Sequence, residues 1–226
     1  MWVERFPEGF EEIVRADELE LAAYVEGEPP PGFDAVDVES GWEDRWREFH
    51  RPVRIGPFWV GPPWERHETN AVPLVIDPGR AFGTGAHATT RLCVEFLTEF
   101  QPGSLLDVGT GSGIVAIAAA KLGFSPVLGI DVDPAAAEAA SSNAAVNGVT
   151  IEVRVADATT EELPKVDVAV ANISLALIET LVPRLDARSI VTSGYLGSDE
   201  PDFGPYVRCE RRVRDGWAAD VLERAE

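Results

Sequence analysis

From Leu105 onward, largely apolar runs of strand length alternate with segments of helical length. The apolar runs are LLDVG, VLGIDV, IEVRVAD, VDVAVANI and SIVTSGY. Near-continuous apolar strands are typical of a parallel sheet that helices cover on both faces. Strands that alternate with helices along the chain favour the same arrangement, because a crossover helix returns the chain to the same end of the sheet. The pattern predicts an α/β fold with a doubly wound, mostly parallel sheet.

Turn and capping residues place the helices between these strands. One helix is expected to begin at Ile114 and to stop at Gly123. The next has Asp133 as its N-cap, Pro134 at its first position and Gly148 just past its end. Further helices are predicted over 89–100 and 175–182, and the tail alternates around Asp215-Gly216 like an antiparallel hairpin at the sheet edge.

The chain before this region is less regular. Residues 1–38 contain the strand-like pieces 2–6, 19–25 and 35–38, enough for a small lobe. The run GWEDRWREFHRP places three aromatic residues on one helical face and ends at a proline. A proline-rich stretch with short strands at 58–60 and 73–76 follows. We therefore expect a small lobe over 1–38, a linker helix and extended connector over 39–70, and the main domain over 71–226.

Charge limits the partners of this chain. It has 39 acidic against 19 basic residues, a net charge of −20, and 15 acidic against 4 basic residues lie in residues 1–50. Nucleic acids and anionic membranes attract basic surfaces, so neither is expected to bind directly. The acidic N-terminal part has two interpretations, a solvated acidic face or a docking surface for a basic partner.

Two further features indicate a cytoplasmic protein. Cys93 and Cys209 are too few for a disulfide framework or a zinc site. The N-terminal MWVERFPEGFEE lacks the basic and apolar regions of a signal peptide, and the longest apolar stretch, 114–120, is too short to cross a bilayer.

A glycine-rich turn, DVGTGSG, links the first strand of the alternating region to its helix. Gly109 and Gly111 let the backbone turn tightly and approach a ligand. The dinucleotide fingerprint needs a small residue at position 114, which is Ile, and Asp107 would repel a pyrophosphate. S-adenosylmethionine suits the turn better, because it has an amino group, a sulfonium and a ribose but no phosphate.

Acidic residues at the next strand ends fit that ligand. Asp131 lies 22 residues after Gly109, where its carboxylate can accept both ribose hydroxyls. Asp133 is better explained as the helix cap. Asp157 ends the third strand and can accept from the adenine amino group, although an exposed strand-end acid is an almost equal interpretation.

Together, DVGTGSG, GIDVDP and VANIS resemble the class I S-adenosylmethionine-dependent methyltransferases. DPGRAFGTGAHATT at residues 77–90, the linker run and PPWE resemble the PrmA family, which methylates lysine and N-terminal amines of the eleventh large-subunit ribosomal protein. The resemblance covers roughly residues 40–226. It implies a seven-stranded Rossmann-like methyltransferase sheet and a basic ribosomal protein as partner. The N-terminal substrate-recognition lobe is shorter here than is usual for the family.

The resemblance also implies site residues. Thr90, Gly109, Asp131 and Asn172 match positions that bind the cofactor in the family. Phe82 is expected to contact the adenine or the methionine chain, unless it is an ordinary core aromatic. His87, within GTGAHATT, is expected to line the cofactor site.

Amine methylation is an in-line displacement that needs alignment and the exclusion of water, but no metal. Asn172 ends the fourth strand and is the candidate catalytic residue that orients the amine, although it can also be a turn-former. No residue stands out as a general base. Two alternatives stay open, a methyltransferase acting on another protein lysine or a small amine, and a paralogue that binds the cofactor without turnover. The sequence does not predict the oligomeric state.

Overall fold

A computed structural model describes residues 51–67, 70–77, 85 and 87–225, together with the backbone of 11–15 and 18–22. The chain divides into two compact units, Met1–Trp46 and Arg47–Glu226. In the first unit β1 (Glu11–Arg15) pairs antiparallel with β2 (Glu18–Ala22). β2 overlaps the predicted strand 19–25. The predicted strands 2–6 and 35–38 and the aromatic linker helix lie outside the described residues.

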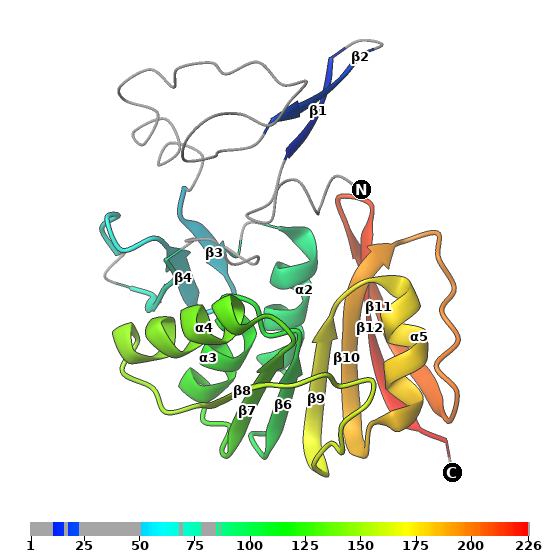
Figure 1. The fold of residues 1–226 in the computed structure, drawn as a ribbon. Coiled ribbons are helices and arrows are strands. Elements are labelled where there is room, and N and C mark those ends of the chain that lie inside the picture. Colours follow the sequence, from blue (N-terminus) through cyan, green and yellow to red (C-terminus); the bar gives the residue numbers. More distant parts are fainter. Residues whose placement is uncertain are drawn as a thin grey trace. The chain divides into compact units, whose positions relative to one another are not determined.

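The second unit is built on a seven-stranded sheet with the order β11-β12-β10-β9-β6-β7-β8 (Figure 1). Its strands are β6 (Leu105–Val108), β7 (Val127–Asp131), β8 (Glu152–Val155), β9 (Val166–Asn172), β10 (Ala187–Leu196), β11 (Tyr206–Arg214) and β12 (Trp217–Arg224). The five strands from β10 to β8 are mutually parallel, whereas β12 is antiparallel to both of its neighbours. The predicted doubly wound, mostly parallel α/β sheet is confirmed.

The helices begin and end close to the residues that the caps predict. They are α2 (Ala88–Leu97), α3 (Ile114–Lys121), α4 (Pro134–Val146) and α5 (Leu175–Leu181), with a 3-10 turn η1 (Val182–Arg184) after α5. The Asp133 carboxylate caps α4 by accepting from the Ala135 N–H at 2.8 Å, and Gly148 follows with a φ of +64°. None of the helices described in the chain is long and apolar enough to cross a membrane.

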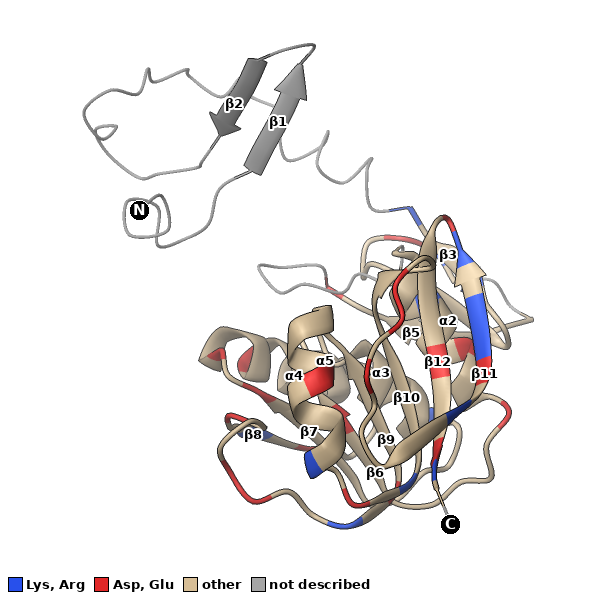
Figure 2. Cartoon of the chain, turned by 90° about the vertical axis from the view of Figure 1, so that its right-hand side faces the viewer, with Lys and Arg blue, Asp and Glu red and all other residues tan. Residues whose placement is uncertain are grey.

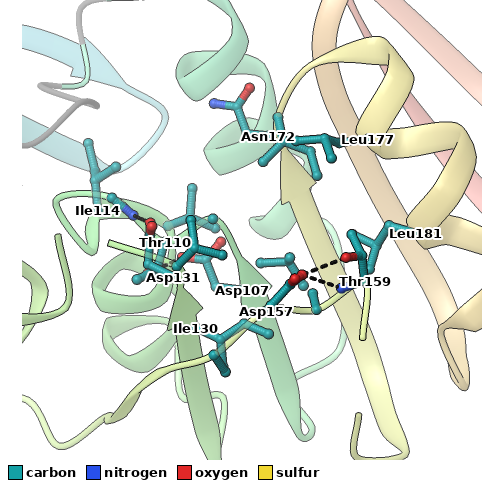
Figure 3. A pocket seen from close by; sticks show the side chains of 18 of the residues that line it. Asp107, Thr110, Ile114, Ile130, Asp131, Asp157, Thr159, Asn172, Leu177 and Leu181 are labelled. Carbon is teal, nitrogen blue, oxygen red and sulfur yellow. Dashed lines mark hydrogen bonds between the residues drawn. The ribbon is translucent and has the colours of Figure 1, made fainter. Parts of the chain in front are cut away.

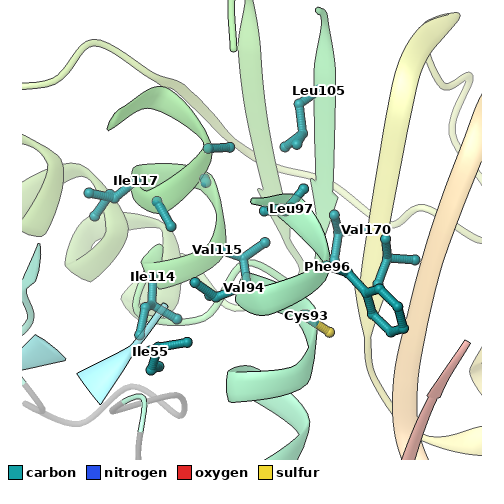
Figure 4. Packing of buried hydrophobic residues seen from close by; sticks show 14 of the residues in the cluster. Ile55, Cys93, Val94, Phe96, Leu97, Leu105, Ile114, Val115, Ile117 and Val170 are labelled. Atoms are coloured by element: carbon teal, nitrogen blue, oxygen red, sulfur yellow. The ribbon is translucent and has the colours of Figure 1, made fainter. Parts of the chain in front are cut away.

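The sheet separates two hydrophobic cores. Side chains of α2, α3 and alternate strand residues such as Leu105 and Val170 form the first core, shown in Figure 4. α5, η1 and the intervening strand residues, such as Leu106 and Ala171, form the second. Burial of apolar area on both faces is the main stabilising term for such a sheet, at roughly 25 cal/mol per Å². This arrangement explains why the strands read as near-continuous apolar runs.

A small second sheet adds to the first core. It consists of β3 (Val53–Ile55), β4 (Phe58–Gly61) and β5 (Val72–Val75), and the predicted short strands 58–60 and 73–76 correspond to β4 and β5. Ile55, Phe58 and Leu74 are completely or almost completely buried in the first core. The part of the predicted connector that forms β3 and β4 therefore packs into the core of the second unit together with β5.

The tail forms the predicted hairpin. Asp215 and Gly216 turn it with φ values of +51° and +82°, the left-handed conformations that a two-residue turn requires. β12 lies between β10 and β11, so β11 is an edge strand of the sheet. Basic residues follow one another along this strand, as the blue segments of β11 in Figure 2 show. These arginines form ion pairs with acidic residues: Arg208 with Glu200, Arg211 with Asp220, Arg212 with Glu99 and Arg214 with Glu95. Charged side chains at an edge oppose pairing with another chain.

Candidate functional site

A pocket of about 300 Å³ opens at the carboxyl ends of β6, β7 and β9 (Figure 3). After β6 the chain builds outward through β7 and β8, and β9 then returns to the other side of β6. Ligands bind at such a switch point because the two loops diverge and leave a crevice between them. The pocket is lined by Thr90, Asp107, Val108, Gly109, Thr110, Gly111, Ile114, Val115, Ile130, Asp131, Val132, Ala156, Asp157, Ala158, Thr159, Asn172, Ile173, Leu177 and Leu181.

The glycine-rich turn forms the floor of this pocket. The N–H groups of Gly109 and Thr110 donate to the carbonyl oxygen of Ile130 at 2.9 and 3.0 Å, which joins the turn to β7. Gly109 has a φ of +68°, and a Cβ there would lie 2.5 Å from Cγ2 of Ile173. Both observations require glycine at this position.

Asp131 stands at the end of β7 with its carboxylate oriented by two backbone groups. Oδ2 accepts from the Gly111 N–H at 2.9 Å, and Oδ1 accepts from the Asp133 N–H at 3.1 Å. A carboxylate has about four acceptor positions, so two remain after these bonds. The carboxylate is thus fixed in place and is still able to accept a pair of hydroxyl groups.

Asp107 is buried beneath the glycine-rich turn, with 2% of its surface exposed. Its Oδ2 accepts from the Thr110 hydroxyl at 2.7 Å and from the Ala116 N–H in the first turn of α3 at 3.2 Å. Burial raises the pKa of this carboxyl from 3.8 to about 6, the two hydrogen bonds oppose the rise, and the charge of Asp131 adds to it. Asp107 therefore fastens the turn to α3 and adds negative charge below the pocket.

Asp157, which follows β8, also lines the pocket. Its Oδ1 accepts from the N–H and the hydroxyl of Thr159 at 2.8 and 2.6 Å, the dashed lines in Figure 3. These hydrogen bonds from Thr159 hold the pKa of the carboxyl below its usual value. Asp157 is therefore an ionised acceptor with one oxygen engaged in its own turn.

Asn172 closes the pocket at the end of β9. Its Nδ2 lies 3.4 Å from the hydroxyl oxygen of Thr90, which is buried in the first turn of α2. The next residue, Ile173, donates its N–H to the Ser193 carbonyl of β10 at 3.1 Å. Gly194 has a φ of +106°, and a Cβ there would collide with the backbone of Ile173. The absence of a side chain at position 194 lets β10 support the residues around Asn172.

The structure brings together six of the eight predicted cofactor residues: Thr90, Gly109, Gly111, Asp131, Asp157 and Asn172 all line the pocket. His87 lies at the N-cap of α2, with Nδ1 2.7 Å from the Thr89 hydroxyl and its ring 4.9 Å from that of Trp217. His87 is therefore the N-cap of α2, and Thr90 lies within the first turn of the helix. His87 is not among the lining residues, and Phe82 lies outside the described residues, so a cofactor role for either stays a prediction.

Sequence reasoning missed the apolar part of the lining. Val132 and Leu177 are 67% and 45% exposed, although large apolar side chains are usually buried, and both border the pocket. Leu177 and Leu181 are four residues apart on α5, so they share one face. That spacing could have indicated an apolar pocket wall, but a helix that faces the hydrophobic core has the same spacing.

The chemistry of the lining selects among ligands. Three aspartates and no lysine or arginine line the pocket within the described part of the chain. A phosphate group would meet only like charge there, whereas a cationic group would be stabilised. The combination of an oriented carboxylate, a tight glycine turn and exposed apolar side chains suits a ligand with a cation, a diol and a flat ring.

Sheet order, helix placement and the site at the switch point define the class I methyltransferase fold. A solved ribosomal protein L11 methylase from Lactobacillus delbrueckii subsp. bulgaricus has this fold with a TM-score of 0.70; it is 28% identical, and the match covers 78% of this chain and all of that one. The family model of ribosomal protein L11 methyltransferase (PrmA) matches residues 19–198. The chain belongs to this family.

Two relatives illustrate the likeness. The ribosomal protein L11 methyltransferase of Symbiobacterium thermophilum is 46% identical over 169 residues, which cover 70% of this chain and 56% of the relative. That of Pelobacter propionicus is 37% identical over 219 residues, which cover 87% of this chain and 71% of the relative. The chain spans little more than half the length of the Symbiobacterium protein.

Proposed function

We propose that this protein binds S-adenosylmethionine in the pocket and transfers its methyl group to amines of ribosomal protein L11. The observation that carries the proposal is the Asp131 carboxylate, held by the Gly111 N–H in a pocket whose described lining contains aspartates but no cationic side chain. The residues fit the cofactor, because it presents a ribose diol, two cationic groups and an adenine ring but no phosphate.

Each part of the lining has a role in this proposal. Asp131 would accept the two ribose hydroxyls with its remaining lone pairs. The glycine-rich turn and the negative charge beneath it would hold the methionine end. Val132 and Leu177, which are exposed, would gain burial against the adenine ring, and Asp157 would accept from its amino group.

The bound cofactor supplies a methyl group on a positively charged sulfur, a carbon that a neutral amine can attack directly. In-line attack by the amine would break the carbon–sulfur bond, and the methylated nitrogen would release a proton to solvent. Asn172 would orient the attacking amine with its amide oxygen, because its Nδ2 already faces the Thr90 hydroxyl. Holding the amine in line with the methyl group would lower the barrier to transfer, because a bimolecular step becomes effectively unimolecular.

The substrate follows from the names of the relatives, which are ribosomal protein L11 methyltransferases. Ribosomal proteins are basic, and this chain carries a net charge of −20, with 15 acidic against 4 basic residues in 1–50. The charges are complementary, which favours encounter between the two proteins. A ribosomal substrate also supports the proposal that the protein acts in the cytoplasm.

The test is incubation of the purified protein with S-adenosylmethionine labelled on its methyl group and with ribosomal protein L11. Label in L11 supports the proposal, and a chemical shift of the labelled group identifies methylated lysine or the N-terminal amine. Asp131→Ala serves as the matched control, because it removes the expected ribose contact from an otherwise intact chain.

Two results would overturn parts of the proposal. Label that enters other lysate proteins or small amines but never L11 would show that L11 is not the substrate. Tight cofactor binding with no label on any acceptor would leave a binding protein without turnover.

A further inference from the structure

Two asparagines four residues apart make hydrogen bonds from α4 to other segments: Asn143 lies within the helix, and Asn147 is its C-cap residue. Asn143 is 2% exposed, yet neither end of its amide lacks a partner. Its Oδ1 accepts from the Asp77 N–H at 3.0 Å, and its Nδ2 donates to the Ser112 carbonyl at 2.9 Å. One buried side chain thus joins two segments that are 35 residues apart in the sequence.

Asn147 makes a different set of contacts. Its Oδ1 accepts from the Val75 N–H at 3.0 Å, and its Nδ2 donates to the Val75 and Asn143 carbonyls at 2.6 and 2.8 Å. It holds β5 against α4 and makes no hydrogen bond to the glycine-rich turn. Both asparagines therefore bind backbone groups in or just after β5, but only Asn143 also bonds the turn.

Ser112 is a fully buried residue of the glycine-rich turn and lies between Gly111, which lines the pocket, and Gly113. On one side Gly111 donates its N–H to Asp131, and on the other Gly113 has a φ of +82° and passes so close to α4 that a Cβ would lie 2.9 Å from Cα of Ala140. Asp77 is the first residue of the DPGRAFGTGAHATT motif. The Asn143 amide thus links the start of that motif to the turn that orients Asp131.

We propose that Asn143 is a positioning residue for the cofactor site. It holds Ser112, and through it Gly111, in the position from which the Gly111 N–H reaches Asp131. This inference rests on the proposed function, because it assigns Asn143 an effect on cofactor affinity through the carboxylate that would bind the ribose.

An amide is required at this position, since it must accept on one side and donate on the other. The directions are fixed by the backbone partners, because Asp77 offers an N–H and Ser112 offers a carbonyl. A carboxylate would keep the first bond but would place an oxygen against the Ser112 carbonyl. An aliphatic side chain would leave the Asp77 N–H and the buried Ser112 carbonyl without these partners.

The experiment compares Asn143→Asp with the matched control Asn147→Asp in the full chain. Cofactor affinity is measured by calorimetry, unfolding by thermal denaturation, and exchange of the Gly111 and Gly113 amides by NMR without cofactor. We expect both variants to lose stability. Asn143→Asp alone should weaken S-adenosylmethionine binding by about tenfold or more, and it alone should speed exchange at the two glycines.

Equal loss of affinity in both variants, or unchanged affinity and exchange in Asn143→Asp, would overturn the inference. If Asn143→Asp does not fold, Asn143→Ser is compared with Asn147→Ser by the same measurements. Failure of the parent protein to bind S-adenosylmethionine would count against the proposed function instead. The exchange of Gly111 and Gly113, measured without cofactor, then decides whether Asn143 positions the turn.

Discussion

The backbone N–H of Gly111 and the Oδ2 atom of Asp131 are joined by a hydrogen bond of 2.9 Å. This bond connects the turn after β6 to the end of the neighbouring strand β7. It fixes the carboxylate without using a cationic partner, so the negative charge remains available to a ligand. The geometry of the pocket floor and the orientation of its main acceptor are therefore coupled.

Two substitutions of Asp131 should distinguish the contribution of its negative charge to cofactor binding from that of its acceptor oxygens. Asp131→Asn keeps an oxygen that can accept from Gly111, whereas Asp131→Ala removes both oxygens. We expect the dissociation constant for S-adenosylmethionine to rise about tenfold in the first variant and a hundredfold or more in the second, since hydrogen bonds to charged groups contribute roughly 1.5–3 kcal/mol each. Calorimetry measures both values.

Asp133→Ala is the control for this pair. It removes the N-cap of α4 and should cost about 1 kcal/mol of stability. It leaves the backbone N–H that bonds Asp131 in place. Cofactor affinity should be unchanged, and equal losses in the Asp131 and Asp133 variants would refute the ribose contact.

Asn172→Ala should slow turnover more than it weakens cofactor binding. The amide is expected to orient the attacking amine, so its loss raises the barrier of the transfer step and leaves most of the cofactor contacts intact. Single-turnover methylation, together with cofactor affinity from calorimetry, tests this. If rate and affinity fall by the same factor, Asn172 is a binding residue only.

Gly194→Ala should damage the pocket from the neighbouring strand. A Cβ at this position meets the backbone of Ile173, and the φ of +106° is one that other residues rarely adopt. We expect loss of stability by several kcal/mol and weaker cofactor binding in whatever folds.

Gly148→Ala offers the milder comparison, because its φ of +64° lies in the left-handed region that residues with a Cβ adopt at a small cost, and a Cβ there meets no atom within 4 Å. Its cost should be only about 1 kcal/mol, with unchanged cofactor affinity. Thermal unfolding and calorimetry of the two variants distinguish collision from backbone strain alone.

The buried carboxyl of Asp107 should make stability depend on pH. Burial raises its pKa to about 6 in the folded protein, whereas in the unfolded chain it stays near its ordinary value of 3.8. Between these values the folded state holds a proton that the unfolded state has released, so rising pH reduces the free energy of unfolding. The contribution of this group is lost progressively between about pH 4 and pH 6.

Asp107→Asn isolates this effect from the other acidic groups. The amide does not titrate, so the stability of the parent relative to the variant should fall by on the order of 3 kcal/mol from pH 4 to pH 7. Urea unfolding at several pH values gives this difference. A constant difference across the range would show that Asp107 titrates normally in the folded protein.

Local signals in the sequence predicted the elements well where the chemistry is local. Asp133 and Gly148 bound α4 because an N-cap carboxylate and a left-handed glycine act within a few residues. Gly109 and Asp131 were predicted together because the carboxyl ends of parallel strands meet at one edge of the sheet. These are the features that place the pocket.

The sequence did not predict the contacts between residues that are far apart along the chain. The stretch from Val53 to Val75 contains prolines and only short strands, so no periodicity indicated that it forms a sheet in the first core. Gly194 of β10 lies against the backbone of Ile173, which follows β9. Nothing near either residue in the sequence specifies this contact. The same holds for Asn143, whose two partners lie in segments remote from α4 and from one another.

The division of the sheet between two cores has a consequence for changes in chain length. Leu105 and Asp107 of β6 face α3, while Leu106 faces the opposite core. Side chains alternate along a strand, so deletion of one residue in β6 would exchange these sets. Asp107 would turn away from Thr110 and α3, and both cores would lose their fit. A deletion of a single codon within β6 would therefore disrupt the packing and the pocket floor in one event.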